Sequence, residues 1–156
     1  MTRRMIRTGA CAAALAALMA GPVMAQDLGA EPTFANLTLM AGFEPDPQRI
    51  ELTAGGTIDA SGIDGGQCMG MIASEPDIRL TYKPDELPLH IKALSASDTT
   101  LVVNDPNGNW FCDDDSGGDL DPKVSFTDPQ EGVYDIWIGT IGEDPVPAVV
   151  EITELD

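Results

Sequence analysis

Short runs in which apolar and polar residues alternate fill the chain from residue 35 onward, and no run shows the longer period of a helix. In VYDIWIGTI (133–141) the alternation is unbroken, which is typical of a strand that turns different faces to core and solvent. The runs that predict strands are residues 35–42, 48–54, 56–61, 77–83, 87–93, 99–105, 109–113, 123–128, 133–141 and 148–155.

The segments between these runs hold most of the Gly, Pro and Asp residues, which are the residues that turns require. Asn107-Gly108 is the strongest single hairpin signal among them. Many short strands at this spacing predict an all-β fold, an antiparallel β-sandwich or jelly roll of about 8–10 short strands. We expect one such domain over residues 36–156, preceded by a flexible mature N-terminus at residues 26–35.

Residues 1–25 have the composition of a secretory signal peptide. Arg3, Arg4 and Arg7 precede an apolar run, and small residues lead to Ala25, where cleavage is expected. The apolar run is short for a bilayer span, so we expect no integral membrane segment after processing. The predicted location is the periplasm or the medium outside a bacterial cell.

The charge of the chain is strongly negative. The 26 Asp and Glu residues outnumber the 8 Lys and Arg residues, and three of those arginines lie in the signal peptide. Such a field repels nucleic acid and attracts cations and basic partners. The alternative is a solvated acidic surface that keeps an exported protein soluble.

Two cysteines, Cys68 and Cys112, remain after removal of the signal peptide. An even pair in an oxidising compartment predicts one disulfide bond. The chain contains no C-x-x-C motif that would indicate a thiol-based enzyme.

Residues 115–118, Asp-Ser-Gly-Gly, resemble the motif around the nucleophilic serine of trypsin-like peptidases. Such an enzyme also needs a histidine base, an orienting aspartate and N–H donors for the oxyanion. Asp114 stands where the family has a glycine, and the single histidine, His90, has none of the family's surrounding residues. We therefore expect a protein that is not an enzyme, with a hydrolase that uses Ser116 as the alternative.

The same stretch offers oxygen ligands for a metal ion. Ca²⁺ takes six to eight oxygens from carboxylates and carbonyls on flexible loops. The EF-hand pattern fails because Gly117 stands at a ligand position, so a site would combine several turns. Solvated aspartates with no metal are the alternative. The candidate ligands are Asp113, Asp114, Asp115, Asp119, Asp121 and, across the hairpin, Asp105.

Residues 98–141 resemble the bacterial pre-peptidase C-terminal domain. The similarity rests on the Asp-Pro-x-Gly turn at residues 105–108, the aspartates at 113–115, and Gly-x-Tyr at 132–134 before an aliphatic-aromatic strand. The resemblance implies a jelly-roll sandwich that is a non-catalytic accessory to secreted peptidases. Some members of that family bind calcium, and some are implicated in binding a matrix or polymer.

Together these features predict an exported, non-catalytic binding module that holds calcium or another divalent cation. Exposed aromatic side chains mark binding surfaces, and Trp110 and Phe111 adjoin the aspartates. One of the two should face outward by alternation and contact a protein or polysaccharide surface, whereas Trp137 is expected in the core. A purely structural envelope protein is the third possibility.

Overall fold

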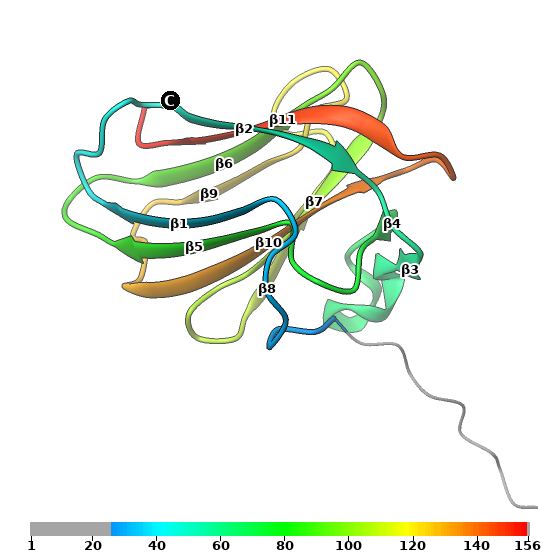
Figure 1. Cartoon of the computed structure of the whole chain (residues 1–156), viewed down its shortest axis with the longest axis horizontal. Coiled ribbons are helices and arrows are strands. Elements are labelled where there is room, and N and C mark those ends of the chain that lie inside the picture. The colour runs from blue at the N-terminus through cyan, green and yellow to red at the C-terminus, as the bar shows by residue number, and fades with distance from the viewer. Residues whose placement is uncertain (1–25, 156) are drawn as a thin grey trace, which may run out of the picture.

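The structure is a computed structural model that describes residues 26–155. The proposed signal peptide at residues 1–25, together with Asp156, lies outside the described residues. The described chain is an all-β sandwich of two packed sheets, as the alternating pattern predicts. Figure 1 shows β1, β5 and β10 side by side in one layer, with β6 and β9 behind them. The described residues include no helix long and apolar enough to cross a membrane.

Each of the ten predicted runs overlaps one strand of the structure, with bounds that differ by up to a few residues, and an eleventh strand, β4, has only two residues. The strands are β1 (Ala35–Met40), β2 (Gln48–Ala54), β3 (Ile58–Asp59), β4 (Met71–Ile72), β5 (Ile78–Lys83), β6 (Leu89–Leu94), β7 (Thr99–Asn104), β8 (Trp110–Asp113), β9 (Lys123–Phe126), β10 (Gly132–Thr140) and β11 (Val146–Thr153).

The seven-stranded sheet A is centred on β10, which pairs with β5 and β4 on one side and with β7 on the other. β8 continues the sheet beyond β7, and β1 continues it beyond β5. The four-stranded sheet B has the order β2-β11-β6-β9. All pairs are antiparallel except β1 with β5, which the sequence did not predict.

The main core lies between the two sheets and follows the alternation of the strands. Tyr134, Ile136 and Ile138 of β10 point inward and are fully buried, and they meet Ile91 and Ile152 from sheet B. The outward side of β10 is buried too, because Trp137 is fully covered. Two faces of one strand are therefore buried, and a second cluster must cover the outer one.

That second cluster is built by residues 56–73, which fold over the outer face of sheet A. Ile63, Ile72 and Cys68 from this segment pack with Val102 and Trp137 of the sheet. Two three-residue 3₁₀ turns, η1 (Ala60–Gly62) and η2 (Asp64–Gly66), shape the segment. A disulfide bond between Cys68 and Cys112 ties it to β8, which confirms the predicted pairing.

Residues 26–34 are hydrogen-bonded to the connection between β4 and β5 and to β5 itself. The N–H groups of Asp27 and Thr33 donate to the carbonyls of Ser74 and Pro76, at 2.9 and 2.8 Å. The Arg79 guanidinium donates to the carbonyl of Leu28 at 2.6 Å. These bonds give the segment a defined place, while its flexibility in solution stays a prediction.

Tyr134 fastens the turn that precedes its own strand. Its hydroxyl donates to the carbonyl of Gln130 and accepts from the N–H of Gln130, both at 2.8 Å. The pattern is that of a tyrosine corner in β-sandwiches. The turn before β10 is therefore fixed from the core.

We expect Tyr134→Phe to lower the free energy of unfolding by about 1–2 kcal/mol, because it removes two hydrogen bonds and leaves the ring in place. Urea denaturation of the two proteins measures the difference. Tyr82→Phe removes the other buried tyrosine hydroxyl, which bonds to Glu154 and not to a turn, and serves as the comparison. A Tyr134→Phe variant with wild-type stability would contradict the assigned role.

Candidate functional site

The Asp-rich loop, residues 114–122, joins β8 to β9 and is fixed at its base by Asp113. The Oδ2 atom of Asp113 accepts from the N–H of Ser116 at 2.9 Å and from the N–H of Lys123 at 2.8 Å. A short carboxylate that caps its own turn in this way is a frequent use of aspartate. Asp113 therefore closes the loop, in addition to any contact with a ligand.

A second predicted ligand on the loop, Asp121, also accepts a hydrogen bond from a backbone N–H group. Asp121 Oδ1 accepts from the N–H of Ser95 at 3.0 Å, which links the loop to the β6–β7 turn. Asp119 has a positive φ of 55°, a conformation that Asp and Asn tolerate better than most residues. Asp115 is exposed on the same loop.

Asp105 lies away from these residues. Asp105 follows the last residue of β7, whereas Asp113 lies opposite Leu101 of the same strand. Leu101 and Asp105 are four residues apart, which corresponds to roughly 13 Å along a strand. Both Asp105 carboxylate oxygens are engaged, with the N–H groups of Asn107 and Asn109 at 2.8 Å and the Asn109 amide at 2.9 Å. The structure thus assigns Asp105 to the β7–β8 hairpin and does not bring it to the loop.

The surroundings of Asp114, on the Asp-rich loop, are unfavourable for a negative charge. Partial burial raises its pKa above the ordinary value, and the neighbouring carboxylates of Asp115, Asp113 and Asp98 raise it further. Asp98 comes from the β6–β7 turn and was missed in the sequence. Its Oδ1 atom is buried and has no hydrogen-bond partner among the described residues. The only signal for Asp98 was its place at the start of β7, the strand that pairs with β8.

A hollow of about 70 Å³ lies beside Asp114, and its lining is mostly polar. Gln67 and Met69 form one wall, and they flank Cys68, so the disulfide bond to Cys112 holds that wall against the end of β8. The Thr100 hydroxyl, also on the hollow, donates to the carbonyl of Asp113 at 3.2 Å. The complete lining is Gln67, Met69, Thr100, Cys112, Asp113 and Asp114.

Within residues 26–155 no three His, Cys, Asp or Glu side chains converge closely enough to hold a metal ion by themselves. The residues that line the hollow include two with carboxylates, Asp113 and Asp114, one with an amide, Gln67, and one with a hydroxyl, Thr100. Hard cations such as Ca²⁺ accept such mixed oxygen sets, with waters as further ligands. The residues present therefore fit a weakly held hard cation and not a soft transition metal.

Ser116 and His90 each bond to a partner on their own part of the fold. The Ser116 hydroxyl donates to the carbonyl of Lys123 at 3.0 Å, within its own turn. His90 lies in β6, and its Nδ1 is 2.8 Å from the Ser125 hydroxyl on the neighbouring strand β9. The sequence did not indicate this cross-strand pair, because it depends on the β6–β9 register.

The two aromatic residues before the aspartates point to opposite faces of β8. Trp110 is half-buried against Trp137, with ring centroids 5.4 Å apart. Phe111 is 38% exposed and packs edge-on against Phe126 at 5.0 Å. Trp137 is fully buried, as expected. Phe111 is thus the more exposed member of the predicted partner-binding pair.

No protein-family model and no curated protein matches this chain. The resemblance of residues 98–141 to the pre-peptidase C-terminal domain therefore stays an expectation.

Proposed function

We propose that this protein is an exported, non-catalytic β-sandwich module that binds Ca²⁺ at the hollow beside the Asp-rich loop. The observation that carries the proposal is the 70 Å³, mostly polar hollow, whose lining includes Asp113 and Asp114 together with Gln67 and Thr100. A hollow of this size suits one partly hydrated ion better than an organic substrate.

Electrostatics supports the same conclusion. The raised pKa of Asp114 reports that its charge is opposed by burial and by neighbouring carboxylates. A bound divalent cation would replace that repulsion by attraction, and it would also act on the unpartnered Oδ1 of Asp98 nearby. The ion would therefore stabilise the loop against the rest of the sandwich.

The expected affinity is low. Calcium sites of extracellular modules have dissociation constants of roughly 10⁻⁴–10⁻³ M, and affinity rises with the number of charged ligands. With two carboxylate residues in its lining, the proposed site is expected to fall in that range. Calcium would then act as a structural ion in a compartment that contains it at millimolar concentration.

We predict that 10 mM CaCl₂ raises the stability of the wild-type protein by about 1.4–2.7 kcal/mol, as expected when a ligand is present at about ten to a hundred times its dissociation constant. Asp114→Asn should lose this gain, because the substitution removes a ligand charge from the hollow. Thermal denaturation with CaCl₂ or EDTA measures the shift, and calorimetric titration measures binding directly.

Asp119→Asn is the matched control, because it removes one loop charge and keeps a residue that tolerates the positive φ. This variant should keep the calcium effect. NaCl at equal ionic strength accounts for screening of the acidic surface. The proposal fails if the wild-type protein shows no calcium shift beyond that of NaCl, or if Asp114→Asn keeps the full shift.

A further inference from the structure

Strand β1 forms a free edge of sheet A. It pairs with β5 on one side, and no other described strand pairs with it. The N–H groups of Ala35 and Ala41 donate to the carbonyls of Asp77 and Lys83, toward β5. Because successive residues of a strand alternate in direction, the N–H and C=O groups of Asn36, Thr38 and Met40 point to the free side.

This edge lacks the features that usually prevent strand addition. The sequence of β1, ANLTLM, contains no charged residue and no proline. Natural edge strands are commonly protected by charged side chains, prolines or bulges. The edge of sheet B shows the contrast, since β2 carries Arg49, which is ion-paired with Glu151, and Glu51. Of these two edge strands, β1 is the one without charged side chains.

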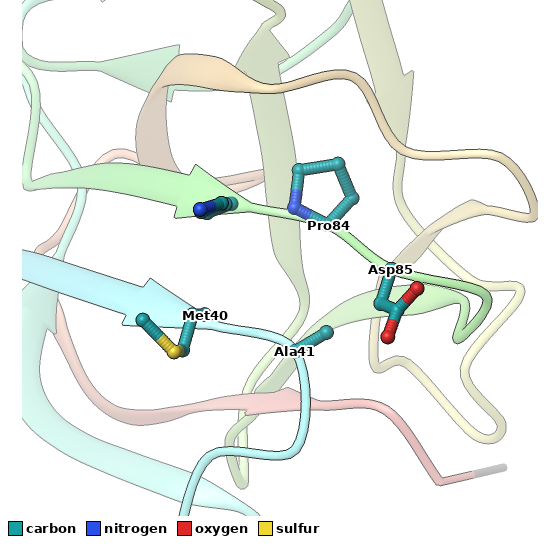
Figure 2. Close-up of a pocket in the computed structure, with 5 residues that line it drawn as sticks. Met40, Ala41, Pro84 and Asp85 are labelled. Atoms are coloured by element: carbon teal, nitrogen blue, oxygen red, sulfur yellow. The ribbon is translucent and has the colours of Figure 1, made fainter.

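The side chains beside the edge offer places for alternate residues of an added strand. Leu37 and Leu39 of β1 and Ile50 of β2 are only partly buried at the margin of the main core. A hollow of about 280 Å³ lies where β1 and β5 end (Figure 2). Its lining residues are Met40, Ala41, Lys83, Pro84 and Asp85, and Met40 is 62% exposed.

We propose that the free edge of β1 accepts an extended, basic segment of another polypeptide as an added strand. In this mode main-chain hydrogen bonds supply affinity and side-chain pockets supply specificity. The apolar side chains of the segment would cover Leu37 and Leu39, and its other side chains would face solvent.

Charge decides the kind of partner. The chain has a formal net charge of −18, so a second copy at this edge would be repelled, whereas a basic segment is attracted. Glu31 precedes β1, Glu44 follows it, and Asp85 and Glu86 adjoin the hollow, all of them exposed. Lys83 is the one basic residue in the lining of the hollow.

This surface is separate from the proposed calcium site. β1 ends beside Lys83, at the end of the sandwich where β10 begins, whereas Asp113 lies beside Leu101, toward the end of β10. Failure of one proposal would therefore leave the other unaffected. Asp114→Asn should bind the segment as the wild-type protein does.

The test uses a fluorescein-labelled peptide, Lys-Val-Lys-Val-Lys-Val-Lys, and fluorescence anisotropy. We expect saturable binding to the wild-type protein that weakens as NaCl is added. Thr38→Pro removes one outward N–H and should weaken binding at least about tenfold, because proline is tolerated at edges but cannot donate. Thr38→Val changes the side chain, keeps the N–H, and should bind as the wild-type protein does.

Peptides measured on the wild-type protein keep the test independent of how well Thr38→Pro folds. Two peptides are each methylated on alternate backbone nitrogens, in opposite phases, and only one phase should lose binding. A Glu-Val counterpart should not bind. The proposal is overturned if the wild-type protein does not bind the basic peptide at about 1 mM, if Thr38→Pro or both methylated peptides bind like their parents, or if the acidic peptide binds equally well.

Discussion

Replacing Cys68 and Cys112 together by alanine should lower the free energy of unfolding by about 4 kcal/mol. The bond spans 44 residues of sequence, and closing a loop of that length removes this much conformational entropy from the unfolded chain. The bond also holds residues 56–73 over Trp137, so its loss should loosen the second cluster first. The same change removes the support of the hollow, and the calcium shift should decrease with it.

Urea denaturation at neutral pH, with and without CaCl₂, measures both effects. Met69→Ala is the comparison, because it trims an exposed side chain on the same wall and leaves the cross-link intact. Its effect on stability should stay within about 0.5 kcal/mol. A double cysteine variant that loses less than about 1 kcal/mol would show that the bond constrains little, and an unchanged calcium shift would place the ion elsewhere.

The strands could be predicted because most of them bury one face. In β11, for example, Ala148, Val150 and Ile152 are buried, and the residues between them are partly exposed. Alternation of this kind is visible in one sequence without any knowledge of the partner strand. The pairing of strands is a different matter. β1 and β5 are parallel and separated by β2, β3 and β4, and no local pattern encodes that contact.

The second cluster could not be predicted from the sequence either. β10 is buried on both faces, yet its residues alternate as if one face were solvated, with Asp135 and Trp137 on the outer side. Asp135 is compatible with burial because Arg79 donates to it at 2.7 Å. A polar residue in the pattern therefore indicated a pair and not an exposed face.

The sequence identified only part of the candidate site, because an aspartate can either cap a turn or bind a metal ion. Nearness in sequence suggested one set of ligands, but Asp105, Asp113 and Asp121 accept hydrogen bonds from backbone N–H groups of turns. Sequence spacing does not separate a turn cap from a metal ligand. Asp98, Gln67 and Thr100 reach the region from other segments, and only the tertiary fold brings them there.

Asp77 leads to the second large expected effect, a pH-dependent loss of stability. Its side chain is 2% exposed, and Oδ2 accepts from the N–H of Ile138 at 2.7 Å. On this side of β10, the pairing with β5 ends at Ile136, and the pairing with β4 begins at Thr140. Ile138 lies between these two paired stretches, and the Asp77 carboxyl accepts its N–H in place of a neighbouring strand. Burial raises the pKa of Asp77 to about 7, although the bond from Ile138 lowers it.

The folded protein therefore holds a proton on Asp77 at a pH where the unfolded chain, with its ordinary pKa of 3.8, has lost it. Stability contributed by this proton is full below pH 4 and falls as pH rises to 7, by about 1.4 kcal/mol per unit and about 4 kcal/mol in all. Above pH 7 the loss is complete. Asp77→Asn cannot ionise and keeps an oxygen for Ile138, so it should be more stable than wild type by up to about 4 kcal/mol at pH 8.

Urea denaturation between pH 4.5 and 8.5 gives the difference between the two proteins. The general repulsion among carboxylates also grows with pH, but it affects both proteins and cancels in that difference. Glu75→Gln removes an exposed carboxylate two residues earlier and should run parallel to wild type. If Asp77→Asn also runs parallel to wild type, the Asp77 carboxyl is ionised in the folded protein throughout this range. If the two curves diverge as pH rises, the sandwich contains a buried acid that weakens it near neutrality.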